Sequence, residues 1–187
     1  MAKKTTLILA SASPRRRELL RRAGIAHRVR PAAVDEKARR GEEPEAYVAR
    51  LARAKATAAW RSGETVLGAD TVVVAGRRLL GKPRDGRDAA RMLRLLAGRV
   101  HQVLTGICLL GPDGAALAAV VRTRVWFRHM TAAEIAAYVA SKEPLDKAGA
   151  YAIQGLASKF VSRIEGCYCN VVGLPVSKVD ELLREAT

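Results

Sequence analysis

The sequence has few aromatic residues, few cysteines and no long apolar run. Phe, Trp and Tyr make up 4% of its 187 residues, which leaves little for the base-stacking surfaces of many nucleic-acid-binding proteins. The three cysteines, Cys108, Cys167 and Cys169, form neither a disulfide framework nor a four-ligand zinc pattern. No segment approaches the roughly 18 apolar residues of a membrane span, and the first ten residues are too weakly apolar for a signal peptide. We therefore expect a cytoplasmic protein with no membrane association.

Acidic residues are also scarce, with 18 Asp and Glu against 33 Lys and Arg, and the formal net charge is +15. Residues 1–99 hold 24 basic and 10 acidic side chains, whereas residues 100–187 hold 9 and 8. A basic half suits an anionic partner such as nucleic acid, a membrane surface or a phosphorylated small molecule. Alternatively, a genome whose base composition favours arginine codons would produce the same excess of basic residues without any anionic partner. The 49% of hydrophobic residues is enough for a folded core, so we expect a single domain over 1–187.

Strand and helix patterns alternate along the chain without repeats or a linker. Strands are expected at 5–10, 26–34, 65–75, 100–110 and 115–128. Helices are expected at 14–23 and 44–61, from an Asp85 cap to Gly98, from the capping box Thr131-Ala-Ala-Glu134, and after Pro175. Residues 151–172 are expected to form strands joined by a turn at Gly166. This alternation predicts an α/β fold with a mixed sheet.

The first strand passes into the first helix at Ala10-Ser11-Ala12-Ser13-Pro14-Arg15-Arg16-Arg17. Ser13 suits the N-cap and Pro14 the first helical position. Three arginines then fall in the first turn, where the helix dipole disfavours cations by about 0.3–1 kcal/mol each. A bound anion removes this conflict, and backbone N–H groups, hydroxyls and guanidinium groups suit a phosphate. A helix whose arginines point into water is the alternative.

Two charged residues lie where apolar ones are expected. Lys55 follows Leu51 by four residues on the apolar stripe of its helix, so its ammonium group either reaches water or meets an anion. Asp70 lies within Val66–Val74, a segment apolar on both faces that is typical of a central strand. An unpaired carboxylate there is costly, so Asp70 needs a metal ion, a lysine or a proton, and Gly68 leaves room for a close approach. We favour a metal ligand or general base.

Two further residues are weaker indications. Lys82 stands in Gly81-Lys82-Pro83, and the preceding hairpin returns it toward the strand of Asp70. Glu36, in Val34-Asp35-Glu36-Lys37, is unremarkable alone. The sequence has no Gly-x-Ser-x-Gly, Walker or dinucleotide motif. Together these residues indicate a pocket with several cations and one or two carboxylates.

Seven motifs occur in order over nearly the whole chain. They are Leu9-Ala-Ser-Ala-Ser-Pro-Arg-Arg16, Leu51-Ala-Arg-Ala-Lys-Ala56, Gly68-Ala-Asp-Thr-Val-Val73, Gly81-Lys-Pro83, Thr105-Gly106, Asp146-Lys-Ala-Gly-Ala-Tyr-Ala-Ile-Gln-Gly155 and Asn170-Val-Val-Gly-Leu-Pro175. This series resembles the motifs of the Maf family of nucleoside triphosphate pyrophosphatases.

The resemblance implies an elongated mixed β-sheet flanked by helices, with two lobes and a central cleft, similar to inosine triphosphate pyrophosphatases. It implies a homodimer that cleaves a nucleoside triphosphate between the α and β phosphorus atoms with a divalent cation, Mg²⁺ or Mn²⁺. The run 146–155 is similar to the branch that prefers dTTP and UTP. The alternative is a basic nucleic-acid-binding protein, or a regulator of cell division, a role attached to the family by name.

The resemblance also implies roles for single residues. Ser11, Arg15, Arg16, Lys55 and Lys82 would hold phosphates, Asp70 would be the proton acceptor or a metal ligand, and Glu36 would be a second metal ligand. Arg15, Thr71 and Gln154 would set base specificity. The amide of Gln154 fits the N3–H donor and O4 acceptor shared by uracil and thymine, and fits cytosine when rotated. Discrimination of uracil and thymine from cytosine therefore requires neighbouring groups that fix the orientation of this amide.

Overall fold

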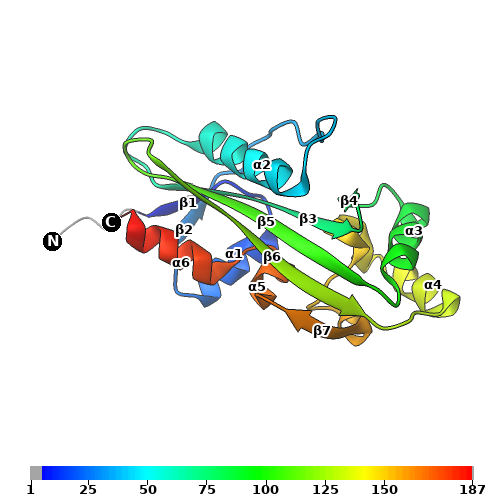
Figure 1. The fold of residues 1–187 in the computed structure, drawn as a ribbon. Coiled ribbons are helices and arrows are strands. Elements are labelled where there is room, and N and C mark those ends of the chain that lie inside the picture. Colours follow the sequence, from blue (N-terminus) through cyan, green and yellow to red (C-terminus); the bar gives the residue numbers. More distant parts are fainter. Residues whose placement is uncertain (1–5, 187) are drawn as a thin grey trace. The chain divides into compact units, whose positions relative to one another are not determined.

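A computed structural model describes residues 6–186 and shows one mixed seven-stranded sheet with helices against it (Figure 1). The strand order is β2-β1-β3-β5-β6-β7, and β4 pairs with β3 off this path. The strands are β1 (Leu7–Leu9), β2 (His27–Val29), β3 (Val66–Ala75), β4 (Arg78–Leu80), β5 (Val100–Leu110), β6 (Ala116–Phe127) and β7 (Val161–Glu165). The predicted α/β class and mixed sheet are confirmed.

Helices and strands alternate, as the sequence pattern predicts. The α-helices are α1 (Pro14–Arg22), α2 (Pro44–Ala59), α3 (Gly86–Leu96), α4 (Ala132–Ala140), α5 (Tyr168–Val172) and α6 (Val176–Glu185). Three 3₁₀ helices follow α4, namely η1 (Glu143–Asp146), η2 (Ala148–Ala150) and η3 (Leu156–Phe160). Among the described residues, none of the helices is both long and apolar enough to cross a membrane.

The chain divides into two compact units. The first comprises the chain up to Asp70, residues 105–121 and the chain from Gly173, and the second comprises residues 71–104 and 122–172. Strands β3, β5 and β6 each run from one unit into the other. The central cleft expected between two lobes stays a prediction.

In the first unit, β1 pairs in parallel with both β2 and β3. Helix α2 lies on one face of this part of the sheet, and α1 and α6 lie on the other (Figure 1). Two glycines allow α2 to approach closely: a Cβ atom on Gly68 would lie 2.1 Å from the carbonyl oxygen of Ala52, and one on Gly106 would lie 2.3 Å from that of Val48. Since Cβ atoms do not tolerate such contacts, β3 and β5 accept the helix backbone only where they carry glycine.

In the second unit, β4 pairs antiparallel with β3 and β7 antiparallel with β6. Helix α3 begins at the expected Asp85 cap, and α4 begins at the expected capping box of Thr131 and Glu134. Aromatic rings fill the core of this unit, where Phe127 makes edge contacts with both His101 and Tyr151.

The expectation of strands over 151–172 is wrong for most of that segment. Only Val161–Glu165 forms a strand, with η3 before it and α5 after it. The side-chain amide nitrogen, Nδ2, of Asn170 donates to the carbonyl oxygen of Val103 and to Oγ1 of Thr123, each at 3.0 Å. These contacts between distant residues hold α5 in place and override the local β propensity. The strand expected over 26–34 is likewise shorter, at His27–Val29.

Candidate active site

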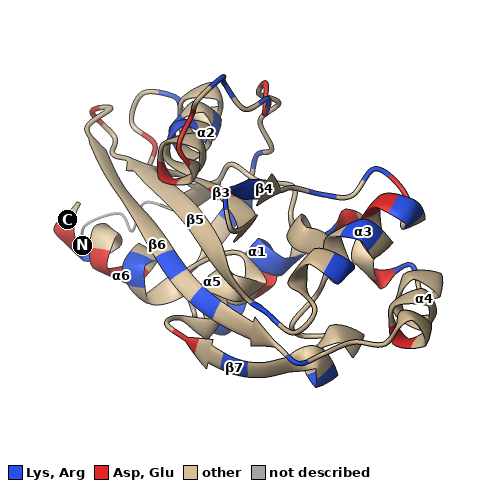
Figure 2. Ribbon diagram, turned by 45° about the vertical axis from the view of Figure 1, so that its right-hand side comes forward, with Lys and Arg blue, Asp and Glu red and all other residues tan. Residues whose placement is uncertain are grey.

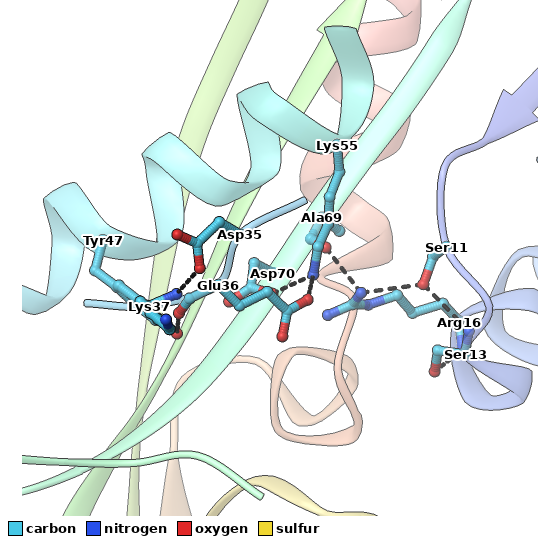
Figure 3. A network of polar contacts seen from close by, with 10 residues as sticks. All are labelled: Ser11, Ser13, Arg16, Asp35, Glu36, Lys37, Tyr47, Lys55, Ala69 and Asp70. Carbon is cyan, nitrogen blue, oxygen red and sulfur yellow. Dashed lines mark hydrogen bonds and ion pairs between the residues drawn. The ribbon is translucent and has the colours of Figure 1, made fainter. Parts of the chain in front are cut away.

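Lys55, Asp70 and Glu36 form a compact charged cluster in the first unit. The Lys55 Nζ atom lies 2.6 Å from Oδ1 of Asp70 and 2.6 Å from Oε1 of Glu36. Figure 3 shows the lysine descending from α2 to meet both carboxylates. Lys55 and Asp70 are each only 8% exposed, so the lysine meets an anion and does not reach water. Of the three partners that Asp70 could have, the structure shows a lysine.

The close packing of α2 on the sheet brings this pair together. The backbone of α2 rests on β3 at Gly68, two residues before Asp70. Leu51, Lys55 and Ala59 follow one another at helical spacing on the buried face of α2. The room that Gly68 leaves is thus filled by a helix, and the helix delivers the lysine to the aspartate.

The segment that carries Glu36 has no regular secondary structure and is bound to α2 by side chains. The Tyr47 hydroxyl donates to the carbonyl oxygen of Glu36 at 2.9 Å. Arg50 donates to the carbonyl oxygen of Lys37 at 3.1 Å and pairs with Glu42 at 2.6 Å. Burial, with smaller contributions from the negative charges of Asp70 and Glu36, raises the pKa of Tyr47 to about 12. Tyr47 therefore stays a hydrogen-bond donor at neutral pH.

Arg16 lies next to this cluster and is itself buried. Its Nε atom donates to the carbonyl oxygen of Gly173 at 2.9 Å, and its Nη1 atom donates to Oγ of Ser11 at 3.1 Å and to the carbonyl oxygen of Ala69 at 2.8 Å. Burial lowers the pKa of Arg16, and the neighbouring Asp70 opposes this shift. The alternative of arginines that point into water is wrong for Arg16, and the binding of an anion there stays a prediction. Its guanidinium group joins the start of α1 to β3 (Figure 3).

The loop between β1 and α1 folds as the sequence predicts. Ser13 is the N-cap of α1 and accepts from the backbone nitrogen of Arg16 at 3.4 Å, and Pro14 occupies the first helical position. Oγ of Ser11 accepts from the backbone nitrogen of Ser13 at 3.2 Å. Ser11 thus binds both the loop and the guanidinium group of Arg16. Arg15 follows on the first turn and is half-buried.

The remaining predicted residues, Thr71, Lys82 and Gln154, belong to the second unit. The structure brings their three segments together there. The backbone nitrogen of Gly149 donates to the carbonyl oxygen of Gly81 at 3.0 Å, and a Cβ atom on Gly149 would lie 2.7 Å from a methyl carbon of Val73 on β3. Lys82 and Gln154 are exposed and Thr71 is half-buried. That these three residues share one pocket with Asp70 stays a prediction.

Comparison with known proteins identifies the family. The model of the family described as "Maf-like protein" matches residues 6–186. The chain belongs to the Maf family. Relatives named dTTP/UTP pyrophosphatase include one from Anaeromyxobacter sp. (strain Fw109-5), 55% identical over 96% of this chain and 89% of its own length. Another, from Koribacter versatilis (strain Ellin345), is 52% identical over 96% of this chain and 94% of its own length.

A solved structure shows the same fold at low sequence identity. The Staphylococcus aureus Ham1 protein superposes with a TM-score of 0.54 over 97% of this chain and 100% of its own, at 14% identity. This likeness confirms the expected fold for the Maf chain and carries no information on substrate.

The two carboxylates suit a hard divalent cation. Among the described residues, no group of three or more His, Cys, Asp or Glu side chains could hold a metal ion. Mg²⁺ needs fewer protein ligands, because it binds through one or two carboxylates together with substrate phosphates and water. Asp70 and Glu36 converge on one point, now taken by Lys55 Nζ. The oxygen ligands of these two carboxylates therefore fit Mg²⁺ or Mn²⁺. In the structure of the Maf chain, one oxygen of each carboxylate is paired with Lys55.

The motifs alone do not indicate that Tyr47 and Arg50 belong to the site. Arg50 would be assigned to solvent because it lies off the apolar stripe of α2, yet it holds the segment of Glu36. Helical spacing offers a signal for Tyr47, which precedes Lys55 by eight residues and so shares its face of α2. No comparable signal marks Arg50, because its partners lie in an irregular segment.

Proposed function

We propose that this Maf family member hydrolyses dTTP and UTP between the α and β phosphorus atoms, releasing a nucleoside monophosphate and pyrophosphate. The observation that carries the proposal is the buried carboxylate of Asp70, which lies against Lys55 and next to Arg16. The names of relatives more than 50% identical over most of the chain support the reaction and the substrates.

Charge explains why a triphosphate suits this site. The described cluster of Arg16, Lys55, Asp70 and Glu36 sums to zero formal charge. A nucleoside triphosphate carries about four negative charges at neutral pH, given a last phosphate pKa near 6. Arg15 and Lys82 would add positive charge around its phosphates. A divalent cation held by Asp70 and Glu36 would supply the rest, neutralising phosphate oxygens as negative charge builds on the leaving pyrophosphate.

Within this proposal the chain's own residues have separate tasks. Ser11, Arg15, Arg16, Lys55 and Lys82 bind the phosphates. Asp70 either accepts the proton of the attacking water or holds the cation, with Glu36 as the second carboxylate. Lys55 can change partner when substrate arrives, because its ammonium group has three donors and a flexible stem. Such an exchange would release carboxylate oxygens in the presence of the triphosphate.

We assign base recognition to Arg15, Thr71 and Gln154. The side chain of Gln154 is exposed while its neighbour Ile153 is buried, so the amide is available to a ligand. One acceptor and two donors on a planar amide match the edge shared by uracil and thymine. Acceptance of both dTTP and UTP would mean that neither the 5-methyl group nor the 2′-hydroxyl is strongly recognised.

The alternative, a nucleic-acid-binding or cell-division regulatory protein, gains no support from the arrangement of charge. Several arginines of the basic first half are paired: Arg21 and Arg22 with Glu18, Arg30 with Glu64, and Arg50 with Glu42. Figure 2 shows both basic and acidic residues on α2 and on α3. These pairs offset part of the basic excess of the first half, whereas a surface for a phosphate backbone requires unopposed cations.

The test is a panel of dTTP, UTP, dCTP, dATP and dGTP with Mg²⁺ or Mn²⁺, assayed for products. The proposal predicts the highest kcat/KM for dTTP and UTP, with monophosphate and pyrophosphate as products. Activity that disappears on chelation and returns with Mg²⁺ would support the metal. A diphosphate with orthophosphate would contradict the scissile bond, and equal rates on all five would contradict the base preference. The dimer and the cytoplasmic location stay predictions.

A further inference from the structure

The carboxylate of Glu143 joins two segments of the second unit. Its Oε1 atom accepts from the Tyr138 hydroxyl at 2.8 Å, and its Oε2 atom accepts from the backbone nitrogen of Leu156 at 3.1 Å. The Tyr138 oxygen in turn accepts from the backbone nitrogen of Ala152 at 3.1 Å. One carboxylate and one phenol thus hold both ends of the turn 152–156.

Gln154 lies in the middle of this turn. The backbone nitrogen of Gly155 donates to the carbonyl oxygen of Ala152 at 3.1 Å and closes the turn. The side chains of Tyr151 and Ile153 are 6% and 7% exposed, whereas Gln154 is exposed. The backbone of Gln154 is therefore anchored on both sides while its amide faces outward.

Gly155 is required for this arrangement. A Cβ atom at this position would lie 2.2 Å from Oε2 of Glu143 and 2.5 Å from its carboxyl carbon. A side chain on residue 155 would displace the carboxylate from the backbone nitrogen of Leu156. The glycine that ends the run Tyr151-Ala-Ile-Gln-Gly155 thus makes room for the carboxylate that binds the turn.

Glu143 and Tyr138 are themselves fixed. The backbone nitrogen of Glu143 donates to Oγ of Ser141 at 3.3 Å, and its carbonyl oxygen accepts from Nζ of Lys147 at 3.1 Å. Tyr138 is 3% exposed and its ring meets Phe160 edge-on. Burial raises the pKa of Tyr138, so its hydroxyl stays protonated and donates to the carboxylate. These anchors let the pair serve as a rigid support.

We propose that Glu143, acting through Tyr138 and the backbone of Leu156, is a positioning residue that holds Gln154 for the recognition of uracil and thymine. The inference rests on the proposed function. Because a rotated or displaced amide fits cytosine, discrimination depends on a turn that keeps the amide in one place. Loss of the support should therefore affect the choice of base more than phosphate cleavage.

The test compares Glu143→Gln with Glu134→Gln. The amide of Glu143→Gln keeps the size of the side chain but replaces one of the two carboxylate oxygens by a donor, so either Tyr138 or Leu156 loses the acceptor that it has in the wild type. We expect the ratio of kcat/KM for dTTP over dCTP to fall about tenfold, as for the loss of one charge-assisted hydrogen bond, while kcat for dTTP stays within about threefold. Glu134 is a matched control because its carboxylate also accepts backbone and side-chain hydrogen bonds, at the start of α4.

Two further measurements keep the result decisive. Tyr138→Phe removes the hydroxyl between Glu143 and Ala152 and should lower the same ratio even if Glu143→Gln does not fold. Hydrogen exchange should show faster exchange at the amide of Leu156 in Glu143→Gln. A wild-type protein with no preference for dTTP and UTP would overturn the proposed function itself. A wild-type preference that both variants keep, or that Glu134→Gln loses equally, would overturn the role of Glu143 alone.

Discussion

The ammonium nitrogen of Lys55 lies 2.6 Å from Oδ1 of Asp70, and both residues are 8% exposed. Burial of two charges costs free energy that their attraction only partly returns, and an apolar pair of similar volume is often as stable. Stability alone therefore does not account for this pair. Its place beside Glu36 and Arg16 connects it to the binding of a charged substrate.

Replacement of Lys55 by methionine should make stability depend on divalent cations. Lys55→Met removes the ammonium group that lies between Asp70 and Glu36, and leaves two carboxylates converging on an apolar side chain. Mg²⁺ should then raise the melting temperature of the variant more than that of the wild type, because an ion that binds only the folded state stabilises it. The measurement is thermal unfolding at several Mg²⁺ concentrations.

Lys178→Met is the control for that experiment, since Lys178 pairs with Glu181 on the exposed face of α6. Its melting temperature should respond to Mg²⁺ as the wild type does. An identical response of Lys55→Met, Lys178→Met and wild type would contradict the assignment of Asp70 and Glu36 as metal ligands.

A single methyl group on Gly68 should separate α2 from β3. The added Cβ atom in Gly68→Ala would lie 2.1 Å from the carbonyl oxygen of Ala52, so helix or strand must move. Overpacking of this kind costs about 1–3 kcal/mol or more. Chemical denaturation should show that loss, and activity should fall further because Lys55 moves with the helix.

Gly81→Ala is the matched control for stability, because a Cβ atom at residue 81 has no heavy atom within 4 Å outside its chain neighbours. Its unfolding free energy should change by less than about 0.5 kcal/mol, as for most surface substitutions. Equal stability of Gly68→Ala and wild type would show that α2 does not approach the sheet as described.

The first unit could be predicted well from the sequence because its signals are local. The Ser13 cap, Pro14 and the charged residues within apolar patterns depend on near neighbours. The structure confirms the cap, and it shows that Asp70 and Lys55, whose partners the sequence left open, pair with each other. The contribution of Arg50 could not be predicted, because its partners at Glu42 and Lys37 lie in a segment without periodicity.

The region from 143 to 172 was harder to predict for a different reason. Its 3₁₀ helices and α5 are held by long-range contacts, such as those from Glu143 to Leu156 and from Asn170 to Val103. A pattern of apolar residues does not encode these partners, so local propensity favours strands. Of the predicted site residues, Gln154 depends most on this region.

Buried His101 should make stability fall between pH 6.5 and 4. The side chain is 2% exposed, and burial lowers its pKa from 6.5 to about 4. In this window the unfolded chain binds a proton at residue 101 that the folded chain does not, so unfolding becomes easier as the pH falls. The loss should reach about 3 kcal/mol at the low end.

Denaturation between pH 6.5 and 5 measures this effect before most carboxylates titrate. His101→Phe should be less stable at neutral pH, because Nε2 of His101 and the hydroxyl of Tyr151 lie 2.9 Å apart and the substitution removes that partner. The variant should nevertheless lose most of the pH dependence in this window, whereas His129→Gln, at an exposed position, should keep it. An unchanged slope in His101→Phe would contradict the assignment.

Replacement of Gln154 should broaden the choice of base without abolishing cleavage. Gln154→Ala removes the amide and leaves the backbone of its turn in place. We expect the kcat/KM values for dTTP and dCTP to approach each other. Leu156→Ala is the control, since the side chain of Leu156 is 54% exposed and the substitution keeps the backbone nitrogen that donates to Glu143. An unchanged ranking of substrates in Gln154→Ala would contradict its role in specificity.

The most direct test of the account is turnover of dTTP by Asp70→Asn, followed by phosphorus NMR with Mg²⁺ present. Glu36 pairs with Lys55 in the wild type and should keep that contact in the variant, so circular dichroism should show a folded protein. We predict that the wild type forms dTMP and pyrophosphate and that Asp70→Asn is slower by about 10²–10⁴-fold, the usual contribution of a general base. A folded Asp70→Asn variant that turns over dTTP at the wild-type rate would contradict the role of Asp70. Formation of dTDP and orthophosphate by the wild type would contradict cleavage between the α and β phosphorus atoms.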